Sequence, residues 1–168
     1  MNINLFLVLS GIISIIVSCV LIDGFISYRT SGKYAKDEYP IAITIMKAIC
    51  FISFALFVPK FIEAFNTYLN LTAQSIEQEG SLILTQLSYL SLYLGLTLLS
   101  FMVTFGLALT LFALMNKGRK LFVELANNDM YSLAFFGGLL VCISITFSSI
   151  LMVILEYFIP YPEFPSYI

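Results

Sequence analysis

The stretch from Leu82 to Met115, LILTQLSYLSLYLGLTLLSFMVTFGLALTLFALM, decides the fold of this 168-residue chain. It contains no charged residue, and its apolar residues follow one another without the strict alternation of a membrane β-strand. A helix of this length covers about 51 Å, whereas the hydrocarbon core of a bilayer is about 30 Å thick. We therefore predict a transmembrane helix that tilts, extends beyond the lipid, or does both.

The composition extends this conclusion to the whole chain. Hydrophobic residues make up 60% of it, and the mean hydropathy is +0.99. A soluble domain of this size has too little interior to bury so much apolar surface. We predict a single all-α domain over residues 1–168, a polytopic integral membrane protein with four transmembrane helices. The expected spans are residues 3–22, 41–65, 82–115 and 131–159.

The first span could be mistaken for a signal peptide. No positive charge precedes it, and Asp23-Gly24-Phe25 follows it where a small-residue cleavage site would stand. We therefore interpret it as a retained anchor.

The basic residues predict the orientation. Six of the eight lie in two short connections, between the first and second spans and between the third and fourth: Arg29, Lys33, Lys36, Lys117, Arg119 and Lys120. The positive-inside rule places the 23–40 and 116–130 loops in the cytoplasm, matrix or stroma. Both termini and the 66–81 loop then face the outer side. The same six residues are candidates for binding anionic lipid.

The membrane itself is predicted from composition. The chain is rich in Ile, Phe, Tyr and Asn and lacks Trp, which is typical of an AT-rich genome. We therefore expect a bacterial inner membrane or an organellar membrane.

An internal similarity connects the second and fourth spans. At one constant offset, five identical pairs align: Asp37 with Asp129, Tyr39 with Tyr131, Ala42 with Ala134, Cys50 with Cys142, and Ile62 with Ile154. Two parallel two-helix units, related by an axis along the membrane normal, would explain it. Chance similarity within a restricted alphabet is the other explanation.

Several chemistries are disfavoured by missing residues. The chain has no His, which is the commonest metal ligand and the usual general base. Its three cysteines, Cys19, Cys50 and Cys142, are isolated within spans, and no nucleotide-binding loop is present. We expect no catalytic, cofactor-binding or metal-binding residues, no enzymatic activity and no nucleic-acid partner.

Lys47 is the charge that lies clearly inside a span, about 9 Å from its inner end if the span is helical. An ionisable group at such depth is a functional candidate, although a Lys stem can also reach the headgroups. We expect no acidic residue at matching depth in the other spans. The expected partners are therefore hydroxyls, carbonyls, a lipid phosphate or another subunit.

A second group of charges is expected at the outer ends of the second and fourth spans. Lys60 and Glu63 are three residues apart and can pair on one helix face, and Glu156 is predicted at a similar height. The cluster would fix helix register through a salt bridge, or form the mouth of an ion or solute path.

Small residues recur at helical spacing in three spans and predict close helix packing. The candidates are Ser10, Ser14, Ser18, Ser91, Gly95, Gly106 and Gly138.

These features favour a non-catalytic membrane subunit or scaffold of a larger membrane protein complex. The small-residue stripes, the overlong third span and the Pro- and aromatic-rich tail all need something to pack against. The alternative is a small homo-oligomeric channel or transporter for an ion or small solute, with Lys47 in its path. An intramembrane enzyme is the least favoured class.

Overall fold

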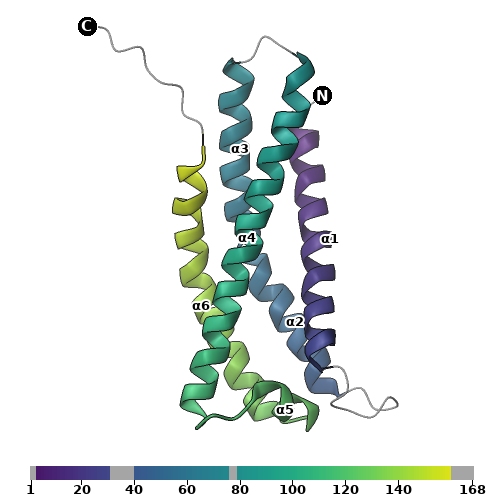
Figure 1. Cartoon of the computed structure of the whole chain (residues 1–168), viewed down its shortest axis with the longest axis vertical. Coiled ribbons are helices and arrows are strands. Elements are labelled where there is room, and N and C mark those ends of the chain that lie inside the picture. Colours follow the sequence, from purple (N-terminus) through teal and green to yellow (C-terminus); the bar gives the residue numbers. More distant parts are fainter. Residues whose placement is uncertain (1–2, 31–39, 76–78, 160–168) are drawn as a thin grey trace, which may run out of the picture.

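The computed structural model describes residues 3–30, 40–75 and 79–159, with side chains for 9–30, 40–72 and 84–159. Helices account for nearly all of these residues: α1 (Ile3–Thr30), α2 (Ile41–Ala55), α3 (Val58–Ser75), α4 (Glu79–Met115), α5 (Leu121–Ala126) and α6 (Met130–Tyr157). Figure 1 shows an elongated bundle in which α1, α4, α6 and the α2–α3 pair run along the long axis. The short α5 lies across one end.

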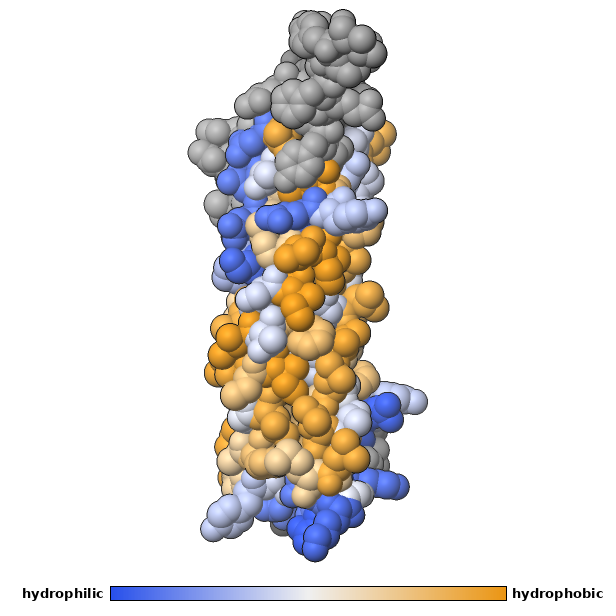
Figure 2. All heavy atoms as spheres, turned by 90° about the vertical axis from the view of Figure 1, so that its left-hand side faces the viewer, coloured by the Kyte–Doolittle hydropathy of each residue, from blue (hydrophilic) through white to orange (hydrophobic). Residues whose placement is uncertain are grey.

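Four stretches of helix are long and apolar enough to cross a membrane: Leu9–Thr30, Ile41–Thr72, Leu84–Met115 and Met130–Tyr157. Figure 2 shows a broad apolar belt, with hydrophilic residues gathered at the lower end and above the belt. The predicted all-α fold with four helices able to span a membrane is therefore confirmed.

The two ends of the bundle differ in shape. The start of α1 and the end of α6 lie at the same end, where α3 and α4 continue beyond both of them (Figure 1). With 37 residues, α4 is about 55 Å long, well beyond the hydrocarbon thickness. Its excess length thus projects from the end opposite α5. Helix occupies much of the expected 66–81 loop, since α3 runs to Ser75 and α4 begins at Glu79.

The first helix is longer than the sequence predicted. It continues through Asp23-Gly24 to Thr30 instead of ending near residue 22. The reason is packing, because Ile26 is buried in the core and the Phe25 ring meets the Phe105 ring edge-on at 5.7 Å. Part of the expected 23–40 loop is therefore helix, and Lys33 and Lys36 lie outside the described residues.

The second predicted span is broken rather than continuous. Helix α2 ends at Ala55 and α3 begins at Val58, with Leu56 and Phe57 forming a turn. Pro59 explains the break, because it has no N–H to donate to the preceding turn and its ring excludes a continuing helix. In the first turn of α3 the missing N–H costs nothing.

At the end of the bundle where α5 lies, side chains cap two helices. The Asn128 side-chain oxygen accepts a 3.0 Å hydrogen bond from the backbone N–H of Ala42, at the start of α2. Asp129 caps α6, accepting from the Tyr131 N–H at 3.0 Å and the Ser132 hydroxyl at 2.7 Å. The Ser132 hydrogen bond is the largest cause that holds the pKa of Asp129 below its ordinary value.

The core of the bundle is mainly aromatic. Phe101 contacts the rings of Phe54 and Phe57 edge-on, at 5.5 and 6.1 Å between centroids. Toward the projecting end, Tyr68 stacks on Tyr89 at 4.3 Å. Aromatic rings therefore join α2, α3 and α4 along the length of the bundle.

The two copies of the predicted repeat occupy different environments. Ala42 and Cys50 are buried, whereas Ala134 and Cys142 are exposed. The α2–α3 pair is also broken, whereas α6 is continuous. Asp37 and Tyr39 lie outside the described residues, so the repeat stays a prediction.

Candidate functional site

Lys47 forms an ion pair between α1 and α2, and this corrects the expectation that no carboxylate would lie at its depth. Its Nζ is 2.6 Å from the Asp23 Oδ1, and it also donates a 3.0 Å hydrogen bond to the Ser27 hydroxyl. Asp23 was expected in a loop, but the extension of α1 carries it alongside α2. The Lys47 side chain is 17% exposed and that of Asp23 is 52% exposed.

The pairing changes what Lys47 can do. A lone cation in a pathway would attract anions, whereas a cation beside a carboxylate is largely neutralised. The contact also connects α1 to α2 about two turns from the end of each helix that lies nearest α5. The arrangement is therefore suited to fixing the positions of two helices relative to each other.

One of the contacts expected in the predicted outer cluster is present in the structure. Lys60 and Glu63 form an ion pair at 3.2 Å on the surface of α3. Glu156 is exposed near the end of α6, and among the described residues no ion pair connects it to Lys60. The three-residue cluster therefore stays a prediction.

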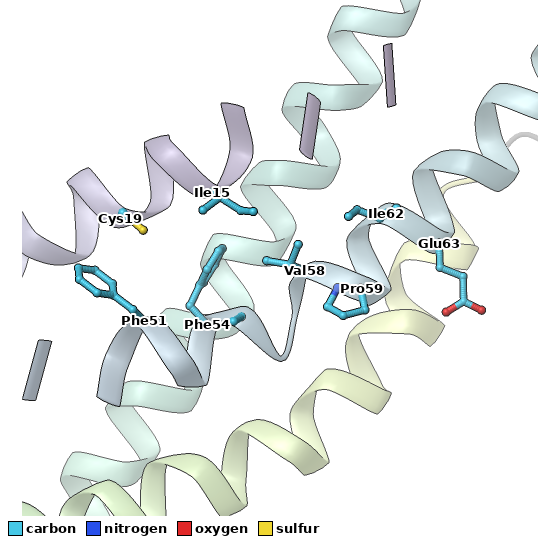
Figure 3. A pocket seen from close by; sticks show the side chains of 9 residues that line it. Ile15, Cys19, Phe51, Phe54, Val58, Pro59, Ile62 and Glu63 are labelled. Carbon is cyan, nitrogen blue, oxygen red and sulfur yellow. The ribbon is translucent and has the colours of Figure 1, made fainter. Parts of the chain in front are cut away.

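A hollow of about 510 Å³ lies beside the break between α2 and α3, against α1 (Figure 3). Its lining is almost wholly apolar and includes Cys19, Phe51, Pro59 and Ile62. Glu63 stands at one end, where its carboxylate is engaged by Lys60. Such a lining can accept an apolar chain, but it offers no pair of groups for acid–base chemistry.

The small residues of α1 face inward. Ser10, Ser14 and Ser18 are buried, with exposures of 3% or less, and Ser18 donates its hydroxyl hydrogen to the Ser14 carbonyl at 2.7 Å. On the same helix, a Cβ added at Gly11 would lie 3.6 Å from the side chain of Ile62. This face of α1 therefore packs against α3.

The packing residues that the sequence predicted in α4 and α6 face outward. Ser91, Gly95, Gly106 and Gly138 are exposed. A Cβ added at any of the three glycines would meet, beyond the adjoining turns of its own helix, no atom of the described residues within 4 Å. Packing within the described part of the chain therefore does not require a small residue at these positions.

Gly137, the neighbour of Gly138, behaves differently. A Cβ added there would lie 2.8 Å from the Ile49 Cδ1, so α6 packs closely on α2 at this point. The Gly137-Gly138 pair is typical of helix packing, but spacing alone cannot distinguish its two halves, and the four-residue spacing to Cys142 selected Gly138. Asp23 was also missed, although Asp23 and Ser27 are four residues apart and share a face if α1 continues.

The remaining candidates are basic residues at the end where α5 lies. Arg29, Arg119 and Lys120 line one hollow there, whereas Lys117 does not. Lys117 lies in the turn after α4, where its φ of 53° and that of Gly118, 82°, are in the left-handed region. Within the described side chains, no group of three His, Cys, Asp or Glu residues is placed to hold a metal ion.

Comparison with protein-family models, curated proteins and solved structures finds no match for this chain.

Proposed function

We propose that this chain is a non-catalytic membrane subunit that packs laterally against other transmembrane helices in a larger complex. The basic end would face the cytoplasm, or the matrix or stroma of an organelle, in a bacterial inner membrane or an organellar membrane. The observation that carries the proposal is the outward position of Gly95, Gly106 and Gly138.

Membrane helices associate where small residues let their backbones approach closely. Glycine also costs about 1 kcal/mol relative to alanine in a helix interior. Within the part of the chain that the structure describes, the three glycines avoid no steric clash. A helix from another chain, seated against α4 or α6, gives them a physical role.

The ion pair supports a structural role rather than a conducting one. Because Asp23 neutralises Lys47, the pair provides a fixed contact between α1 and α2. Neither of the two hollows described above includes Lys47.

The proposal is tested by the composition of the native assembly. The full chain is extracted into nanodiscs from cells that produce it at native levels, and its mass and co-purifying subunits are determined by mass spectrometry. The expected result is an unrelated subunit in fixed stoichiometry. Gly138→Leu should reduce its recovery at least tenfold.

Gly24→Leu is the matched control, because Gly24 is also an exposed helical glycine, and no atom from another described helix lies near its Cβ position. It should leave the assembly intact. A monomer without partners, or equal losses in both variants, would contradict the proposal. If the protein formed a homo-oligomer that conducts ions, and Lys47→Met abolished the conduction, the channel or transporter would be the function instead.

A further inference from the structure

A hollow of about 470 Å³ lies at the basic end, between the end of α1, the last turns of α4 and α5. Its volume falls within the ~300–1,000 Å³ that small-molecule sites occupy. Three cations from two separate segments line it: Arg29 closes α1, while Arg119 and Lys120 precede α5. The Arg29 guanidinium lies 5.7 Å from the centroid of the Phe25 ring, which helps to hold its position.

These cations form no ion pair with another side chain in the described part of the protein. Asp129 exerts an attraction on Arg119, but its carboxylate is already bound by the Ser132 hydroxyl and the Tyr131 N–H. Three like charges around one hollow repel each other, and a bound anion would relieve that repulsion.

The rest of the lining is apolar. Leu109 and Ala113 come from α4, and Phe122 comes from α5. A free phosphate ion would use the cations and leave this surface unused. An amphiphile with an anionic head and an acyl chain would use both.

We propose that this hollow binds one anionic phospholipid. Its phosphate contacts Arg29, Arg119 and Lys120, and an acyl chain lies against Leu109, Ala113 and Phe122. Lys117 takes no part, although it lies in the same turn and carries the same charge. This site is independent of the proposed lateral packing of α4 and α6.

The test uses the full chain, purified in detergent and stripped of lipid. Native mass spectrometry follows bound lipid as dioleoyl phosphatidylglycerol or dioleoyl phosphatidylcholine is added. The wild type should bind one phosphatidylglycerol in preference to phosphatidylcholine. Arg119→Gln/Lys120→Gln should weaken phosphatidylglycerol binding about 25-fold, since each basic residue near a membrane surface contributes about fivefold. Binding of phosphatidylcholine should not change.

Two matched controls separate a built site from general attraction. Lys117→Gln removes the same charge outside the hollow and should change affinity less than about twofold. Ala113→Phe fills the hollow without changing charge and should weaken binding, whereas Leu114→Phe, on the exposed side of the same helix, should not. The comparison of Ala113→Phe with Leu114→Phe also tests the proposed lipid site if the double charge variant fails to fold.

Three outcomes would overturn the proposal. Equal losses in Lys117→Gln and in the double variant would mean diffuse electrostatic attraction. Unchanged binding in Ala113→Phe would mean that the hollow is not used. Displacement of phosphatidylglycerol by millimolar inorganic phosphate, at ionic strength held constant with chloride, would mean a site for free phosphate.

Discussion

The serines of α1 and the glycines of α4 and α6 share one sequence pattern but lie in opposite surroundings. Ser10, Ser14 and Ser18 are buried against the rest of the chain. Gly106 and Gly138 are exposed, and no atom from another described helix lies near their Cβ positions. The spacing of small residues therefore indicates where helices can approach closely, but not whether the approaching helix belongs to the same chain.

The comparison is sharpest between two adjacent residues. Gly137→Leu should lower the free energy of unfolding by about 3 kcal/mol, because its side chain would overlap Ile49 of α2. Gly138→Leu should not lower it and should raise it by up to about 1 kcal/mol, because it removes the helix-propensity cost of glycine without a clash in the described part of the chain. Reversible unfolding in mixed micelles, followed by circular dichroism, measures both values. Equal effects would mean that α2 and α6 are not in contact at Gly137.

A second pair tests the same distinction on other helices. Ser14→Leu should destabilise the protein by about 2 kcal/mol, because it inserts a large side chain between α1 and its neighbours. Ser91→Leu makes the same change at an exposed position of α4 and should fall within about 0.5 kcal/mol of the wild type. The unfolding assay is the same, and a costly Ser91→Leu would refute the outward position of this face.

The ion pair between α1 and α2 extends the comparison to charged contacts. Lys47→Met should cost about 1–2 kcal/mol, between the values typical of surface and buried pairs, because it leaves Asp23 without its partner. Adding Asp23→Asn should recover most of this loss. Unfolding free energies of the two single variants and the double variant complete the cycle. If the double variant lost as much unfolding free energy as the two single variants lost together, direct pairing would be contradicted.

The smallest effect is expected at the surface of α3. Lys60 and Glu63 are well exposed, with side-chain exposures of 38% and 56%. Their coupling energy should be about 0.3–0.5 kcal/mol in a double-mutant cycle and should decrease with added salt. The cycle between Lys60 and Glu156 should give a smaller value. A larger coupling energy between Lys60 and Glu156 than between Lys60 and Glu63 would support the outer cluster that the sequence predicts.

Much of the fold was predictable because the bilayer imposes simple rules. Long apolar stretches must become helices in a bilayer. The break at Pro59 was not predicted, since the expected 41–65 span ran through it, although proline has no N–H to donate to the preceding turn. The extension of α1 was not predictable, because Asp-Gly favours an end to a helix and only tertiary contacts of Phe25 and Ile26 override it. The carboxylate partner of Lys47 was missed for the same reason.

The candidate site at the basic end was predicted only as a set of charges. The positive-inside rule predicted that six basic residues lie on one side of the membrane. It could not predict that Arg119 and Lys120 line the hollow and that Lys117 does not. Their separation depends on the turn after α4, where Lys117 and Gly118 take left-handed backbone angles. Local conformation, and not charge count, thus determines which cations share the hollow.

The hydrogen bond between Asn128 and the N–H of Ala42 has a consequence for biosynthesis. The two residues are 86 positions apart, and the cap at the start of α2 comes from the turn that precedes the last span. A ribosome delivers α2 to the membrane long before Asn128 is made. The backbone N–H of Ala42 therefore lacks this partner until Asn128 is made and its turn reaches the start of α2.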